Sequence, residues 1–177
     1  MHAWTEGDQR LRVVEQPVPK DDKEAKALAC YGVRVSCPAD PERFQKRVWL
    51  RFVDGRPVST VTTQFLAWTC EELERAGKKV WVLIWDNAPW HVSKAVRAWI
   101  RAHNRQVKQE GRGVRILACY LPAKSPWLNP IEACWARAKP CVYEANGLLT
   151  SEELADRVCA RFDCKHEPHL AVPDKVV

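Results

Sequence analysis

The segment from Lys79 to His91 constrains the fold more than any other part of the chain. Six consecutive apolar residues, Val80 to Trp85, run directly into Asp86 and Asn87. An uninterrupted apolar run of this length predicts a strand that is buried on both faces of a sheet. Such a strand ends where the acid begins, and α/β folds place ligand chemistry at that edge. Asp86 therefore has two open interpretations, a functional carboxylate or an ordinary turn and helix cap.

The length and charge of the chain limit its class. A chain of 177 residues suits one well-packed domain, and the net charge of +6 is compatible with a polyanionic partner without requiring one. No signal peptide is recognisable, and no apolar run approaches the roughly 20 residues that cross a bilayer. We therefore expect a cytoplasmic protein without a membrane partner, whose eight cysteines are reduced thiols.

Apolar periodicity and turn signals predict an α/β order of elements. The expected strands are 11–14, 27–36, 47–52, 80–85 and 114–121. The expected helices are 59–76, 92–109, 129 to a break at Pro140, and 150–162, the last with a capping box that involves Glu153. Most of the nine tryptophans lie in apolar contexts and are interpreted as core, namely Trp49, Trp68, Trp81, Trp85, Trp99 and Trp135.

The helix expected over 92–109 has two distinct faces. Apolar residues fall within an arc of about 100°, as a core-facing stripe requires. The opposite side carries a cationic stripe, formed by Lys94, Arg97, Arg101, Arg105 and Lys108. This stripe is either a solvated surface or a set of phosphate contacts, because phosphate neutralisation needs only well-placed cations.

A second acid, Glu132, lies at the expected start of the helix after strand 114–121. Asn129 is a good N-cap, Pro130 suits the first helical position, and Glu132 falls at the third, which predicts a capping box. In the functional interpretation, Asp86 and Glu132 converge on divalent metal, because Mg²⁺ prefers carboxylate oxygens and water. The two acids are separated by 46 positions in the sequence, which leaves room for one helix and one strand.

These residues carry a family resemblance. The motifs resemble the catalytic core of DDE transposases of the mariner superfamily, particularly bacterial insertion-sequence members. They are Asp86-Asn87-Ala88-Pro89 with His91, Leu121-Pro122, Ser125-Pro126, Leu128-Asn129-Pro130-Ile131-Glu132 with Trp135, and upstream Gly55-Arg56-Pro57-Val58-Ser59. The resemblance covers about residues 1–162, and its specificity rests on the two acid motifs.

The resemblance implies an RNase H-like fold, with a mixed five-stranded central sheet, helices on both faces and three acids that bind two Mg²⁺ or Mn²⁺ ions. Asp86 matches the second acid and Glu132 the third. The family's first acid lies on the first strand, ahead of a segment resembling 2–7, so we expect that strand and the upstream DNA-binding region to be missing. We expect a partial domain over 1–165 and a tail over 166–177.

The implied activity is metal-dependent cleavage of DNA at insertion-sequence ends, followed by attack of the freed 3′ hydroxyl on target DNA. Without the first acid, the chain is expected to be an impaired fragment. Asp8 and Asp54 are weak substitutes on positional grounds. The expected location is the cytoplasm, in association with the nucleoid. One alternative is an inactive remnant that only binds DNA or pairs with a full-length transposase, and another is a cellular RNase H-like nuclease. Homo-oligomerisation is also open.

Supporting roles follow from position beside the two acids. Asn87 and His91 are candidates to orient metal-bound water or DNA, although a turn and a helix start explain them equally well. Asn129 is assigned a supporting role next to Glu132. Lys124 and Ser125 are candidate phosphate contacts.

The C-terminal part holds the only metal-like grouping of the sequence. It consists of Cys159, Cys164, His166 and His169. Its spacing matches no standard zinc module, so the sequence assigns it no role.

Overall fold

A computed structural model describes residues 2–4, 10–12, 28–45, 47–142 and 149–172 of the chain, with side chains from residue 28 onward. Helices and strands alternate along it, which confirms the α/β class. The elements are β1 (His2–Trp4), β2 (Arg10–Arg12), β3 (Leu28–Val35), α1 (Pro41–Phe44), β4 (Arg47–Asp54), α2 (Ser59–Arg75), β5 (Val80–Trp85), α3 (Lys94–Glu110), β6 (Arg115–Tyr120), η1 (Pro126–Leu128), α4 (Pro130–Val142) and α5 (Ser151–Phe162).

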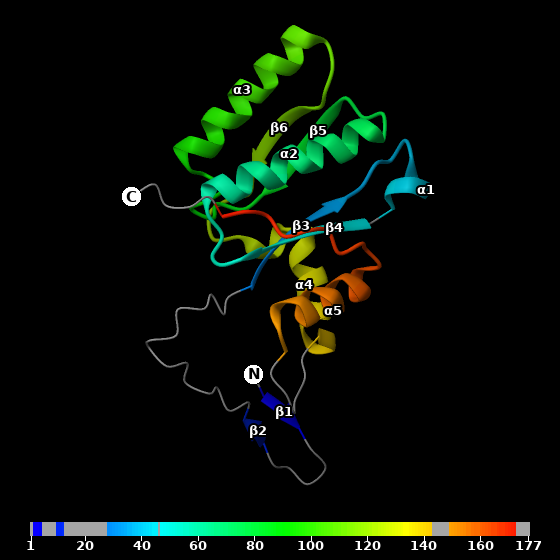
Figure 1. Ribbon diagram of the computed structural model, residues 1–177, viewed down its shortest axis with the longest axis vertical. Coiled ribbons are helices and arrows are strands. Elements are labelled where there is room, and N and C mark those ends of the chain that lie inside the picture. The colour runs from blue at the N-terminus through cyan, green and yellow to red at the C-terminus, as the bar shows by residue number, and fades with distance from the viewer. Residues whose placement is uncertain (1, 5–9, 13–27, 46, 143–148, 173–177) are drawn as a thin grey trace.

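Strands β3 and β4 form an antiparallel hairpin covered by helices on both faces (Figure 1). Successive side chains of a strand point to opposite faces. On β4, Val53 packs with Phe65 of α2, whereas Phe52 packs with Ile131 of α4 and Ala155 of α5. Helix α2 therefore lies on one face, and α4 and α5 lie on the other.

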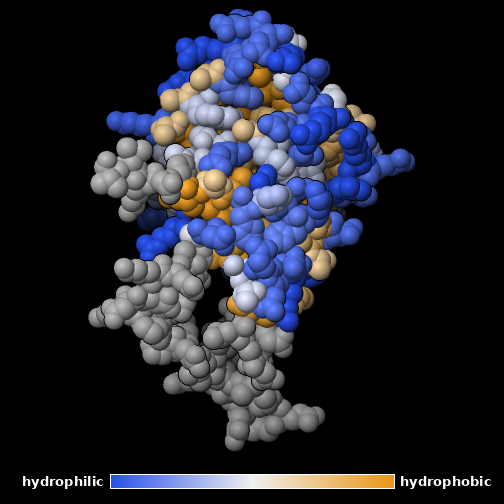
Figure 2. Space-filling view, viewed as in Figure 1, coloured by the Kyte–Doolittle hydropathy of each residue, from blue (hydrophilic) through white to orange (hydrophobic). Residues whose placement is uncertain are grey.

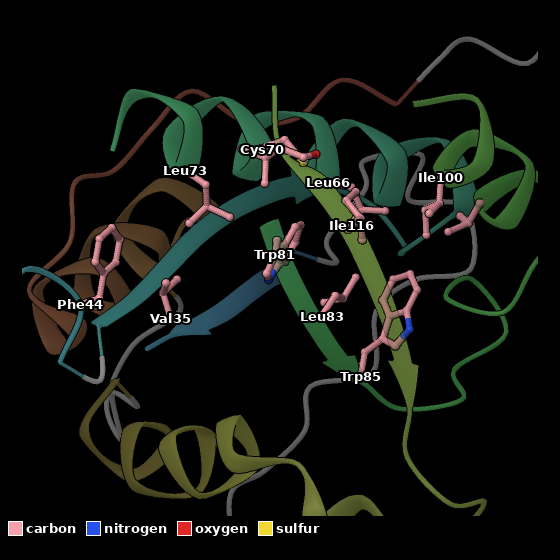
Figure 3. Close-up of a cluster of buried hydrophobic side chains, with 12 residues drawn as sticks. Val35, Phe44, Leu66, Cys70, Leu73, Trp81, Leu83, Trp85, Ile100 and Ile116 are labelled. Carbon is pink, nitrogen blue, oxygen red and sulfur yellow. Dashed lines mark hydrogen bonds between the residues drawn. The ribbon is translucent and has the colours of Figure 1, made fainter. Parts of the chain in front are cut away.

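Strands β5 and β6 are parallel, with α3 as the crossover between them. Trp81, Leu83 and Trp85 of β5 all point to the same side of the strand (Figure 3). There they form one buried cluster with residues of α2 and α3, including Leu66 and Ile100. This cluster fixes the strand whose carboxyl end carries Asp86.

The expectation that β5 is buried on both faces is wrong. Val80, Val82 and Ile84 are 52%, 56% and 52% exposed. Helices α2 and α3 cover only the face that carries Trp81 and its neighbours, and the described residues leave the other face open. The apolar run therefore marks a strand with one open apolar face.

The described strands form three two-stranded sheets, β1–β2, β3–β4 and β5–β6. A cavity of about 860 Å³ separates β3 from β5 and is lined along both strands. Within the described part of the chain, β3 pairs only with β4, and β5 pairs only with β6. The five-stranded sheet that the resemblance implies is therefore not formed by these residues.

The first part of the chain also differs from expectation. The strand expected over 11–14 overlaps β2 at 11–12, while 13–14 lie outside the described residues. Strand β2 pairs antiparallel with β1, which is not among the strands expected from the sequence.

Helix boundaries follow the sequence except at two places. Helix α3 begins at Lys94, two residues later than expected, because the Ser93 side chain accepts a hydrogen bond from Val96 N and caps it. Helix α4 continues through Pro140 to Val142, so the expected break is wrong. Pro140 removes one hydrogen bond in the last described turn, and burial of Ala138 and Val142 holds that turn in place.

Burial confirms most of the expected core. Trp81 and Trp85 are buried, and Trp49, Trp68, Trp99 and Trp135 are partly buried. All eight cysteines are free thiols. None of the described helices is long and apolar enough to span a membrane.

Candidate functional site

Asp86 directly follows β5, and its two carboxylate oxygens differ in their contacts. Oδ1 accepts hydrogen bonds from Ala88 N at 3.0 Å and His91 Nδ1 at 2.7 Å. Oδ2 has no hydrogen-bond partner among the described residues. Asp86 therefore makes the turn that its residue type predicts and keeps one oxygen available for a ligand.

His91 is fixed by contacts on several sides. Its ring stacks on Trp85, with centroids 4.9 Å apart and an interplanar angle of 18°, and meets Trp90 edge-on at 5.9 Å. Because an ionised carboxylate only accepts hydrogen bonds, Nδ1 donates to Asp86 and leaves Nε2 with a lone pair in the neutral ring. The aromatic contacts therefore hold His91 in the orientation that positions Asp86.

Asn87 joins the loops that follow β5 and β6. Its Nδ2 donates to the carbonyl oxygen of Leu121 at 2.6 Å. This bond keeps the loop before α4 beside the carboxyl end of β5. The structural interpretation of Asn87 is therefore satisfied, and its contact with water or DNA stays a prediction.

Glu132 is the third residue of α4, but the expected capping box is absent. The Asn129 N–H donates instead to Pro126 O at 2.9 Å, in the turn of η1, and Glu132 N donates to Asn129 O at 3.0 Å. The exposed Glu132 carboxylate has no hydrogen bond or ion pair with another described residue. The capping prediction is wrong because the preceding 3₁₀ turn occupies the N–H that Glu132 was expected to cap.

The structure brings the two acids to one cavity. Asp86, His91, Asn129 and Glu132 all line the cavity between β3 and β5. Asp86 Oδ2 and the Glu132 carboxylate are hard oxygen ligands without protein partners in the described chain, which is the donor chemistry that Mg²⁺ and Mn²⁺ favour. The chemistry of these two carboxylates therefore suits a divalent ion.

The two expected phosphate contacts in the loop before η1 lie next to this site. Lys124 and Ser125 line a smaller cavity of about 210 Å³ together with Asp86 and Asn87. The Ser125 hydroxyl donates to Ala123 O at 3.4 Å. Lys124 is exposed and has a positive φ of 56°. The loop thus places a cation beside the acid at the end of β5.

The cationic stripe lies on the exposed side of α3, opposite buried Val96 and Ile100. Figure 2 shows hydrophilic side chains covering the end of the molecule that carries α3. The Arg97 guanidinium lies over the Tyr120 ring at 5.6 Å, so the stripe reaches the carboxyl end of β6. This placement suits phosphate contacts and a solvated surface equally.

Sequence reasoning missed Trp127, which lies in η1 between Lys124 and Glu132. Its side chain is 74% exposed, the highest value among the large exposed apolar residues. An exposed indole can stack on a nucleic acid base. The available signal was an aromatic residue in a proline-flanked loop, between Pro126 and Leu128.

The remaining predicted groups lie elsewhere. Asp54, proposed as a substitute acid, hydrogen-bonds to His169 Nδ1 at 2.8 Å and does not line the cavity of Asp86 and Glu132. Asp8 lies outside the described residues. His166 and His169 gather with Glu152 rather than with Cys159 or Cys164.

The thiols of the two cysteines in that grouping have raised pKa values. Burial, followed by the nearby Cys164, raises the pKa of the Cys159 thiol to about 12. Burial also raises the pKa of Cys164. Both side chains are therefore protonated thiols near neutral pH.

Comparison with protein families matches residues 44–154 to a family described as DDE superfamily endonuclease. The match covers more than half of the 177-residue chain and includes both Asp86 and Glu132. Comparison with curated proteins and with solved structures finds no match.

Proposed function

Because this chain belongs to the DDE superfamily endonuclease family, we propose that it is the catalytic-domain part of an insertion-sequence transposase of the mariner superfamily. The observation that carries the proposal is that Asp86 and Glu132 line one cavity. Each of the two carboxylates has an oxygen without a hydrogen-bond partner among the described residues. The substrate is DNA, and the reaction is phosphodiester cleavage followed by strand transfer.

Asp86 and Glu132 hold Mg²⁺ or Mn²⁺ in this proposal. When bound, these ions supply activation of the attacking water or hydroxyl and stabilisation of the leaving oxygen. His91 keeps the Asp86 carboxylate oriented through Oδ1, so that Oδ2 faces its ligand without rearrangement. Asn87 keeps the Lys124 loop close to the acids.

A further strand completes the site in this proposal. It lies in the cavity between β3 and β5, joins the two sheets into one RNase H-like sheet and carries the family's first acid at its end. The support is the lining of the cavity, which follows β3 from Ala29 to Val35 and β5 from Val80 to Trp85. The described residues alone then have two of three acids, and we expect impaired cleavage by this chain.

DNA contacts come from residues around the acids. The cationic stripe of α3 and Lys124 neutralise phosphates, which predicts binding that weakens steeply with salt. Trp127 stacks on a base near the cleaved position, which its exposure permits.

Mn²⁺ binding by the purified chain tests the proposed acids. We expect binding in the parent chain and its loss in Asp86→Asn and Glu132→Gln, while Glu74→Gln, an exposed change on α2, binds normally. Retention of full Mn²⁺ affinity in Glu132→Gln would contradict the proposal.

Incubation with supercoiled DNA and Mn²⁺ distinguishes the enzyme from a non-catalytic remnant. Nicking that disappears in both acid variants supports residual catalysis. Salt-sensitive DNA binding without any nicking favours the alternative, a remnant that binds DNA or associates with a complete transposase.

A further inference from the structure

A second cluster of ligating side chains lies at the start of α5, away from the cavity of Asp86. One atom each from Glu152, His166 and His169 lies within 4.8 Å of the others. The Nε2 atoms of the two histidines are 3.2 Å apart. Each also lies 3.8 Å from a carboxylate oxygen of Glu152. Two imidazoles and one carboxylate therefore converge on one point.

The opposite nitrogen of each histidine is held by a carboxylate. His166 Nδ1 lies 2.7 Å from Asp156 Oδ1, and His169 Nδ1 lies 2.8 Å from Asp54 Oδ2. Because ionised carboxylates only accept hydrogen bonds, both Nδ1 atoms carry protons. In the neutral rings, both Nε2 atoms then present lone pairs to each other and to Glu152. A cation at the point of convergence would relieve the repulsion between these lone pairs and the Glu152 carboxylate.

We propose that Glu152, His166 and His169 bind a transition-metal ion of the Zn²⁺ class. Zn–N bonds of about 2.0–2.1 Å at a tetrahedral angle place two ligand atoms about 3.3 Å apart, close to the observed 3.2 Å. Histidine ligands of metals ordinarily donate their other N–H to a carboxylate, as Asp54 and Asp156 provide. Water completes the fourth position.

The surrounding fold holds the ligands in place before metal binds. The ring of Phe52, on β4, contacts both imidazoles, with centroid distances of 5.5 Å to His166 and 5.8 Å to His169. Glu152 and Asp156 are four residues apart on α5, so they share one face of the helix. The side chains of both histidines are only 20% and 13% exposed, which limits their alternative rotamers.

The site would fasten the segment 163–172, which hydrogen-bonds to the edge of β4, to α5. Leu170 N donates to Phe52 O at 2.7 Å, and Arg51 Nη2 donates to Pro168 O at 2.7 Å. This segment follows α5 and runs beside β4 (Figure 1). A metal shared by α5 and the segment adds a link to these hydrogen bonds, so its main effect is on stability.

Nitrogen ligands separate this site from the proposed catalytic one. Imidazole suits Zn²⁺ and related ions, whereas carboxylate and water suit Mg²⁺. The two sites should therefore bind different metals, and different variants should abolish that binding. Zn²⁺ stabilisation should survive Glu132→Gln, and Mn²⁺ binding at the Asp86 site should survive Glu152→Gln.

The test is titration of the chelator-treated full chain with Zn²⁺, followed by calorimetry and thermal unfolding. We expect one Zn²⁺ per chain and a rise in Tm, because a ligand that binds only the folded state stabilises it. Co²⁺ in place of Zn²⁺ should give visible absorption bands of a nitrogen and oxygen site. A strong sulfur-to-cobalt band would mean that cysteines hold the metal and would overturn the proposal.

Three variants sharpen the result. Glu152→Gln changes an exposed side chain, so the fold should persist while the Zn²⁺-dependent rise in Tm is lost. His166→Asn with His169→Asn should abolish binding, and Asp156→Ala should weaken it by about 10–100-fold through loss of orientation. Glu74→Gln is the matched surface control.

Two outcomes would refute the site. One is stoichiometric Zn²⁺ binding that persists in folded Glu152→Gln and in the double histidine variant. The other is an absence of Zn²⁺ binding by the folded parent chain.

Discussion

His91 Nδ1 lies 2.7 Å from Asp86 Oδ1, and this contact orients the acid at the end of β5. His91→Ala removes the donor, and we expect Mn²⁺ affinity to fall by about 10–100-fold, as for other residues that orient metal ligands. His91→Asn keeps an N–H near the position of Nδ1 and should restore part of the affinity. Calorimetry on both variants checks this, and equal affinities of the alanine and asparagine variants would contradict the positioning role.

Two glutamates at the third position of a helix should respond differently to mutation. Glu153 completes a capping box with Thr150 at the start of α5, whereas Glu132 makes no such bond in α4. Glu132→Ala should change the free energy of unfolding by less than about 0.5 kcal/mol, as at ordinary surface positions. Thr150→Ala should cost about 1 kcal/mol through loss of the cap. Urea unfolding measures both, and a large loss for Glu132→Ala would show a structural role.

The Glu153 cap should also make stability depend on pH. Hydrogen bonds from the Thr150 backbone N–H, and then from its hydroxyl, hold the pKa of Glu153 below its ordinary value of 4.5. A lowered pKa in the folded state stabilises the protein above the ordinary value, and this contribution is lost as pH falls through the folded pKa. The Tm difference between the parent chain and Glu153→Gln should therefore be largest near neutral pH and shrink in acid. A difference that grows in acid would contradict the cap.

Gly32 allows α4 to approach β3 closely. A Cβ on residue 32 would lie 2.5 Å from a ring carbon of Trp135. Gly32→Ala should therefore cost about 1–3 kcal/mol through overpacking. Adding Trp135→Leu should recover part of the loss, which a double-mutant cycle of unfolding free energies would detect. Additive effects of the two changes would mean that the close contact does not limit stability.

Local patterns predicted the elements that carry the site. The apolar run before Asp86 identified β5, and the Thr150–Glu153 pair identified the start of α5 with its capping box. These elements are determined by interactions between residues that are neighbours in the sequence, so the sequence alone predicts them. The acids were recognised from motifs, and the family match includes both positions.

Features that depend on tertiary contacts were missed. Exposure of Val82 depends on which face α2 and α3 cover, and continuation of α4 past Pro140 depends on the packing of Val142. The absent cap at Glu132 depends on η1, which uses the Asn129 N–H. Periodicity within a segment contains none of this information.

The histidine cluster shows the same limit. Sequence proximity grouped His166 with Cys164, whereas folding places it beside Glu152 and brings Asp54 to its neighbour His169. Asp54 and His169 are 115 residues apart in the chain. Ligand sets assembled from several elements cannot be found from local spacing.

Mn²⁺-induced broadening of backbone NMR signals tests the central claim most directly, because a paramagnetic ion broadens signals only near its site. We predict that substoichiometric Mn²⁺ broadens the amides around Asp86 and Glu132 together, and that Glu132→Gln removes this effect while leaving the folded spectrum unchanged. Broadening of only one of the two regions in the parent chain, or unchanged broadening in Glu132→Gln, would contradict a shared metal site.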